Sequence, residues 1–170
     1  MRTGTIYDPQ TWNKQPVVNT HNCYDYAMNN VENKNKTSQP GRKANQPLAT
    51  KNEFTCPNIS RLFHKDMRVS GVDIIKSKNG ICPKGTRRVQ LWVDPYESHI
   101  KNDNYDYHWY REDITGTWSH KPGKNKITNI DDSGNIIHDP KFSDRNYENL
   151  NLNYTDFCGE YCVPNRVNVD

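Results

Sequence analysis

The sequence lacks the long apolar segments that membrane insertion or secretion would require. It contains no run of about 18 apolar residues, so we expect no membrane-spanning helix. Residues 1–5 lack the apolar segment of a signal peptide, which predicts an intracellular protein. No Lys/Arg run is dense enough to follow a phosphate backbone, and we therefore expect no nucleic-acid partner.

Apolar residues are also scarce, at 32% of the chain with a mean hydropathy of −1.09. Globular proteins usually contain roughly 45–50% when glycine is included, so disorder is the first alternative. A net charge of only +3 and an aromatic content of 11% argue against it, because disordered chains are rich in charge and poor in aromatics. We therefore expect one folded domain spanning residues 1–170.

Cysteine occurs five times, so at least one thiol is free or bonded outside the chain. This number fits one reactive thiol with up to two disulfides, and it also fits five reduced thiols, the usual cytosolic state. Cys56, Cys82, Cys158 and Cys162 could instead hold a tetrahedral zinc ion. Their spacing is poor for zinc, however, and inert thiols are the expected state, with a disulfide between Cys158 and Cys162 as an alternative.

The first half of the chain predicts helices. We expect residues 1–19 to be extended, because prolines interrupt them. A helix is predicted from residue 20 onward, where apolar residues recur at every fourth position, and a second one at residues 58–69. The polar residues 32–52 between them predict a long surface loop.

The second half predicts antiparallel strands. Residues 87–94 alternate between two faces, and residues 105–112 alternate as well, with odd-numbered positions on one face and even-numbered positions on the other. Residues 126–130 and 135–138 predict a hairpin. Helices followed by strands indicate an α+β fold, with N-terminal helices packed on an antiparallel sheet.

Cys23 is the candidate nucleophile. It lies in the first turn of a predicted helix, where free backbone amides and the helix dipole favour a thiolate. A thiolate is the nucleophile in cysteine catalysis. The alternative interpretation is a small, buried apolar residue.

Three histidines are candidates for the general base. His108 ranks first, because bulky neighbours on a strand could hold its ring rigidly, His120 ranks second and His21 third. Asp139 follows the predicted hairpin and could accept the second N–H of the imidazole. The structural alternatives are a histidine packed in a sheet and a turn aspartate that precedes Pro140.

The order of these residues resembles that of papain-like thiol peptidases. On this resemblance Cys23 is the nucleophile, His108 the base and Asp139 the orienting residue. The resemblance covers three short segments, and residues 107–123 also look like uncharacterised bacterial and viral proteins. It implies a papain-like fold and hydrolysis of a peptide, isopeptide (deubiquitinase-like) or related amide bond in a peptide or protein substrate, without a metal or organic cofactor.

The resemblance also implies an oxyanion hole. In papain-like enzymes it combines the backbone N–H of the nucleophile with the side chain of an upstream glutamine. Gln15 and Asn19 are the candidates here, eight and four residues before Cys23. Neither position follows the pattern of the family.

A binding protein is the alternative from another class. It would be a non-catalytic, aromatic-rich α+β module, with or without structural zinc, whose Tyr and Trp residues between positions 105 and 118 contact another protein. The same aromatics would otherwise form a sheet core. The two classes differ in one distance, since catalysis requires the Cys23 sulfur within roughly 4 Å of a ring nitrogen of His108. The sequence does not determine the oligomeric state.

Overall fold

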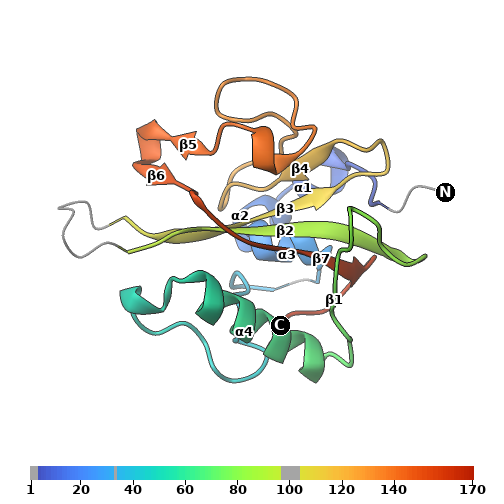
Figure 1. Ribbon diagram of the computed structural model, residues 1–170, viewed down its shortest axis with the longest axis vertical. Helices are drawn as coiled ribbons and strands as arrows, with labels where there is room; N and C mark the ends of the chain where they lie inside the picture. The colour runs from blue at the N-terminus through green and yellow to red at the C-terminus, as the bar shows by residue number, and fades with distance from the viewer. Residues whose placement is uncertain (1–3, 33, 97–103) are drawn as a thin grey trace.

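A five-stranded antiparallel sheet forms the centre of the structure (Figure 1). The structure is a computed structural model that describes residues 4–32, 34–96 and 104–170. The strands of the sheet are β1 Ile75–Lys76, β2 Thr86–Asp94, β3 Asp106–Glu112, β4 Trp118–His120 and β7 Asp156–Pro164. They lie in the order β1-β7-β2-β3-β4, so the last strand of the chain is inserted next to the central strand β2.

Helices cover one face of this sheet. They are α1 Pro9–Trp12, α2 Val17–Thr20, α3 Cys23–Met28 and α4 Cys56–Val69. α3 and α4 bring their apolar sides to β3, β7 and β2, and Phe63 of α4 lies against Trp109 of β3 with ring centroids 4.8 Å apart. Thr55 caps α4 by accepting a hydrogen bond from the amide of Asn58, which fixes where this helix begins.

Short elements cover the opposite face. They are η2 Pro140–Phe142, β5 Asn146–Tyr147, η3 Glu148–Leu150 and β6 Leu152–Asn153. Figure 1 shows β5 and β6 above the sheet and α4 below it. A second apolar cluster lies under these elements and consists of Trp92, Tyr110, Trp118, Ile137 and Tyr154. The sheet is therefore buried on both faces.

The predicted α+β class is confirmed. The second predicted helix is α4, and the two predicted alternating strands are β2 and β3. Odd-numbered positions of β3 face the helices, as Tyr107 and Trp109 belong to the cluster that contains α3 and α4. Among the described residues, no helix has both the length and the apolar character needed to cross a bilayer.

Three local predictions differ from the structure. The segment before residue 20 contains α1 and α2, because Asp8 caps α1 and prolines are compatible with the first turn of a helix. The helix predicted from residue 20 begins only at Cys23, after the cap residue Asn22. The hairpin predicted at residues 126–138 is reduced to isolated bridges, including one between Ile130 and Ile136.

Candidate functional site

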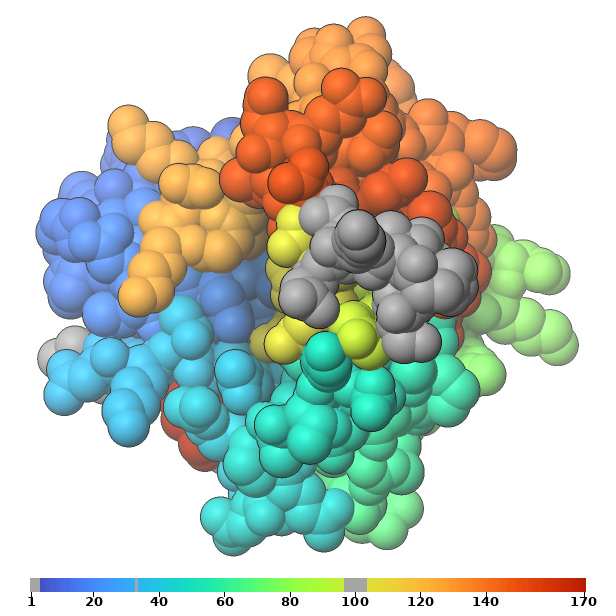
Figure 2. Space-filling model, turned by 90° about the vertical axis from the view of Figure 1, so that its left-hand side faces the viewer, coloured from blue at the N-terminus to red at the C-terminus, as the bar shows by residue number. Residues whose placement is uncertain are grey.

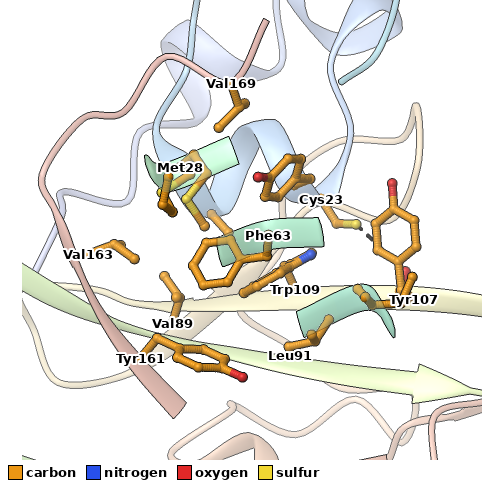
Figure 3. Close-up of a cluster of buried hydrophobic side chains, with 14 of the residues drawn as sticks. Cys23, Met28, Phe63, Val89, Leu91, Tyr107, Trp109, Tyr161, Val163 and Val169 are labelled. Carbon is orange, nitrogen blue, oxygen red and sulfur yellow. Dashed lines mark hydrogen bonds between the residues drawn. The ribbon is translucent and has the colours of Figure 1, made fainter. Parts of the chain in front are cut away.

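Cys23 is sealed in the core between α3 and the sheet. Its side chain is 5% exposed, and its sulfur lies 3.8 Å from the carbonyl oxygen of Tyr107 (Figure 3). The first-turn amides that would favour a thiolate are already engaged, since the side chain of Asn22 accepts hydrogen bonds from the amides of Tyr24 and Asp25. Burial raises the pKa of the Cys23 thiol, and the carboxylate of Asp106 raises it further. The residue is therefore a protonated core thiol at neutral pH.

His108 lies on the other face of the sheet. Its ring stacks on Tyr154 with centroids 5.0 Å apart, and its Nε2 lies 2.7 Å from Nδ1 of His120. Successive side chains of a strand point to opposite faces of the sheet. Tyr107 lies on the same face as Cys23, and His108 therefore points to the opposite face. Burial lowers the pKa of His108 well below its ordinary value, and the neighbouring His120 lowers it further. The structure therefore does not bring Cys23 and His108 together.

The other candidate bases have structural partners of their own. His120 ends β4, its Nε2 lies 3.3 Å from the carbonyl oxygen of Ile130, and burial lowers its pKa to about 4. His21 is 1% exposed, and its Nε2 lies 3.0 Å from the carbonyl oxygen of Glu32. His120 is thus a residue of the sheet, and His21 fixes the chain that follows α3.

Asp139 and the two oxyanion candidates are also placed elsewhere. Asp139 is the N-cap of η2, where it accepts hydrogen bonds from the amide of Lys141 at 2.9 Å and from the side chain of Gln90 at 3.1 Å. Gln15 and Asn19 are both exposed, in the turn before α2 and on α2 itself. The predicted catalytic residues are therefore distributed over both faces of the sheet and over the surface.

The remaining cysteines form two disulfides. Cys56 of α4 is bonded to Cys158 of β7, and Cys82 is bonded to Cys162 of β7, with Cα–Cα distances of 4.9 and 5.5 Å. Cys23 is the free cysteine of the described chain. The expectation of inert thiols is wrong, and so is a bond between Cys158 and Cys162. The four proposed zinc ligands are consumed by these bonds, and the described residues contain no group of His, Cys, Asp and Glu placed to hold a metal.

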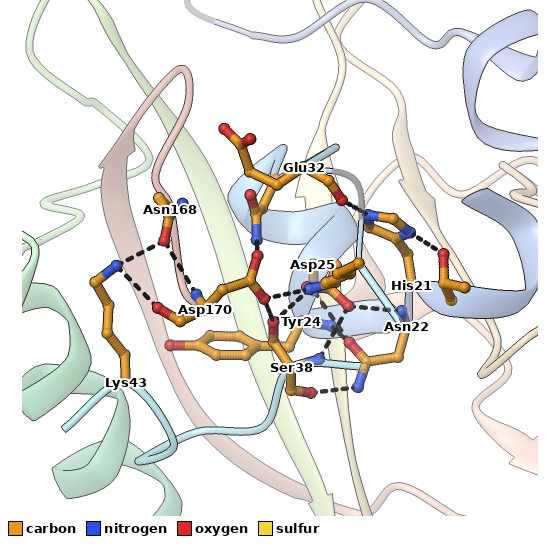
Figure 4. Close-up of polar contacts among 12 residues, drawn as sticks. His21, Asn22, Tyr24, Asp25, Glu32, Ser38, Lys43, Asn168 and Asp170 are labelled. Carbon is orange, nitrogen blue, oxygen red and sulfur yellow. Dashed lines mark hydrogen bonds and ion pairs between the residues drawn. The ribbon is translucent and has the colours of Figure 1, made fainter. Parts of the chain in front are cut away.

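A polar network that the sequence analysis missed fixes the loop after α3 (Figure 4). Asp25 accepts the amide of Asn22 at 2.9 Å and pairs with Lys34. Lys34 also lies 2.6 Å from a carboxylate oxygen of Asp170, the same oxygen that accepts from the hydroxyl of Ser38. The last residue of the chain is thus tied to residues 34–38. The contacting partners named here are up to 136 positions apart in the sequence, and no short motif signals their contact.

Comparisons with known proteins bear directly on the enzyme hypothesis. Over 168 residues the chain is 32% identical to insoluble matrix shell protein 1 of Ruditapes philippinarum, and the match covers 98% of this chain and 95% of that protein. No protein-family model matches the chain, and neither does any solved structure. A relationship over the whole length to a matrix protein overturns the prediction of a cysteine hydrolase. The thiol peptidase or amidase activity and the Cys-His-Asp triad expected of it are therefore wrong.

Proposed function

Because the chain belongs to the family of insoluble matrix shell protein 1, we propose that it is a non-catalytic structural component of an insoluble matrix. The observation that carries the proposal is the extent of the match, which leaves only about 2% of this chain outside the alignment. A shared segment of that length includes the sheet, the helices that pack on one of its faces and the short elements that pack on the other. The proposal therefore concerns the whole fold rather than one module within it.

The environment of the free thiol supports a role without catalysis. A cysteine nucleophile needs an accessible thiolate and a base within hydrogen-bond reach. Cys23 is buried, its pKa is raised by burial, and the carbonyl oxygen of Tyr107 lies beside its sulfur. The binding alternative also changes in detail, since Trp109, Tyr110 and Trp118 belong to the core and are not free to contact a partner.

The two disulfides support a location outside the reducing cytosol. Disulfides persist in oxidising compartments and are rare where glutathione keeps thiols reduced. Both bonds of this chain end on β7, and they fasten α4 and the β1–β2 connection to the sheet. We therefore propose an extracellular location in place of the intracellular one that the N-terminal residues suggested. The papain-like fold stays a prediction, because the α+β order is its only feature with support.

Sequential extraction of the tissue that produces the protein tests the matrix role. An antibody raised against the folded chain would follow it through salt buffer, then non-ionic detergent, then denaturant with a reductant. We expect the protein to stay in the residue after the first two steps and to appear in the third. Purified oxidised chain added to the same homogenate is the control for nonspecific trapping and should leave with the salt buffer. Recovery of the native protein entirely in the salt fraction would contradict the proposal.

A further inference from the structure

Three cationic side chains converge on a surface hollow between α2, the loop after α3 and the turn after β4. The hollow has a volume of about 250 Å³ and is lined by Asn19, Asn35, Lys36, Thr37, Arg42 and Lys124. Figure 2 shows the light-blue loop after α3 next to the light-orange turn after β4 on this side of the molecule. The lining contains three positive charges and no carboxylate, and we call it the cationic hollow.

These three cations have no side-chain partner within the described part of the chain. Two other lysines of the loop after α3 do have partners: Lys34 contacts the carboxylates of Asp25 and Asp170, and Lys43 donates to Asn168. No hydrogen bond or ion pair joins the side chains of Lys36, Arg42 or Lys124, which line the cationic hollow, to any described residue. Like charges gathered without a counter-charge create a positive potential that attracts anions.

The nearby carboxylates form their hydrogen bonds and ion pairs with groups other than these three cations. A neighbouring hollow of about 540 Å³ shares Asn35, Lys36, Thr37 and Arg42 with the cationic hollow and contains Glu32 and Asp170. Glu32 is paired with Arg166 at 2.9 Å. Asp170 accepts hydrogen bonds from Lys34, Ser38 and Asn30. Both acids therefore bond to groups other than the three cations of the hollow, and the charge of Lys34 is shared between Asp170 and Asp25.

The walls of the cationic hollow are held in place from inside the molecule. The ammonium group of Lys121, whose residue is 0% exposed, donates to the carbonyl oxygens of Val18, Gly123 and Asn125 at 2.8–2.9 Å. These bonds join α2, which carries Asn19, to the turn that carries Lys124. The opposite wall is fixed by the Asp25–Lys34–Asp170 network around the buried Ser38. A preformed site loses less entropy when it binds a ligand.

We propose that the cationic hollow binds a tetrahedral oxyanion, a sulfate or phosphate group. A guanidinium can donate two parallel hydrogen bonds to such a group, and ammonium groups act on it as point charges. The amides of Asn19 and Asn35 and the hydroxyl of Thr37 add neutral donors at the same hollow. Three cations match a doubly charged tetrahedral group better than a singly charged carboxylate. This inference does not rest on the matrix role, and either can fail without the other.

Isothermal titration calorimetry of the full oxidised chain at constant ionic strength tests the proposal. The probes are inorganic sulfate, inorganic phosphate and acetate. We expect saturable binding of sulfate or phosphate and at least about tenfold weaker binding of acetate, because losing one charge-assisted contact costs about tenfold in affinity. Arg42→Gln should weaken binding about tenfold, and Lys36→Gln and Lys124→Gln should each weaken it by a similar factor.

Lys84→Gln is the matched control, because it removes the same charge from an exposed loop outside the cationic hollow. Its affinity should equal that of the unmodified chain. The monoesters glucose 6-sulfate and glucose 6-phosphate, titrated next, distinguish the two sources, and tighter binding of either ester supports the proposal. The proposal is overturned if neither inorganic ion binds saturably, if acetate binds equally well, or if Arg42→Gln and Lys84→Gln have the same effect.

Discussion

Removal of one disulfide should lower stability by an amount that depends on the other disulfide. Cys56→Ala combined with Cys158→Ala opens a bond between residues 102 apart in sequence. Taken alone, a crosslink of that span stabilises by about 4.7 kcal/mol in the chain-entropy model. With Cys82–Cys162 intact, however, the shortest covalent path between the two sites spans only roughly 30 residues, so the bond adds about 4 kcal/mol.

By the same reasoning, the stability lost when both disulfides are removed should differ from the sum of the two single losses. Removing either one should cost up to about 3.6 kcal/mol, and removing both should cost up to about 8.3 kcal/mol, which is about 1 kcal/mol more than the two single losses together. A loss of that size is comparable to the whole net stability of a typical domain, about 5–15 kcal/mol. The chain without disulfides should therefore be close to unfolding at room temperature.

Urea unfolding monitored by tryptophan fluorescence measures these losses, with the slope of each transition reported beside its midpoint. Cys23→Ala is the matched control for cysteine removal, and it should cost only what the loss of a small buried group costs. Unmodified protein treated with a reductant should approach the stability of the variant without disulfides. The reasoning is refuted if a single-disulfide variant loses less than about 1 kcal/mol at an unchanged slope, or if the folded protein contains five free thiols.

Three further perturbations test the core and its electrostatics. Burial lowers the pKa of His120 to about 4, so the folded state binds fewer protons than the unfolded state, and stability present above about pH 6.5 is lost as the pH falls toward 4. In urea titrations, the free energy of unfolding that is lost between about pH 7.5 and pH 5 should be about 2 kcal/mol smaller in His120→Gln than in the unmodified protein. An unchanged loss would exclude a lowered pKa of His120 as its cause. Arg111→Leu should destabilise the protein by about 3–5 kcal/mol, because the buried guanidinium donates to the carbonyl oxygen of Tyr26 and stacks on its ring at 3.6 Å. A cost below about 1 kcal/mol would contradict a stabilising role of these contacts. Gly41→Ala should lower the free energy of unfolding by about 2 kcal/mol, because φ is +88° and the new Cβ would overlap the carbonyl oxygen of Gln46. An unchanged melting temperature would contradict this turn geometry.

Local periodicity predicted the elements whose burial follows from their own sequence. α4, β2 and β3 were located by their apolar patterns, because each has one face in the core cluster. β7 was not predicted, since its partners β1 and β2 lie far before it in the chain and its residues show no simple alternation. The register shift opposite Leu91 and Trp92 further disturbs the pattern of this strand.

The catalytic hypothesis was wrong because it did not determine which face of the sheet His108 occupies. The alternation of residues 105–112 was correct, but a period of two does not say which face the helices cover. The larger apolar side chains, Tyr107 and Trp109, belong to the helix side, and His108 is consequently on the other side. Cys23 itself shares the apolar stripe of its helix with Ala27, and that shared stripe was the signal of a core residue.

The pairing of the cysteines and the cationic hollow could not be predicted from the sequence, for a different reason. Four cysteines allow three pairings, and spacing alone cannot select among them. The cations of the hollow come from loop positions 36 and 42 and from position 124, which only the folded chain brings together. Long-range contacts of this kind leave no periodic trace in the sequence.

The accessibility of Cys23 in the native protein tests the account most directly. Intact-mass analysis after iodoacetamide treatment at neutral pH, without a reductant, counts the thiols that react. The account predicts no added label on the folded, disulfide-bonded chain and one label, on Cys23, when the same sample is unfolded in urea, because burial raises the pKa of this thiol and seals it beneath the helix. Rapid labelling of Cys23 in the folded protein would contradict the account, since it would mean that an accessible thiolate exists after all.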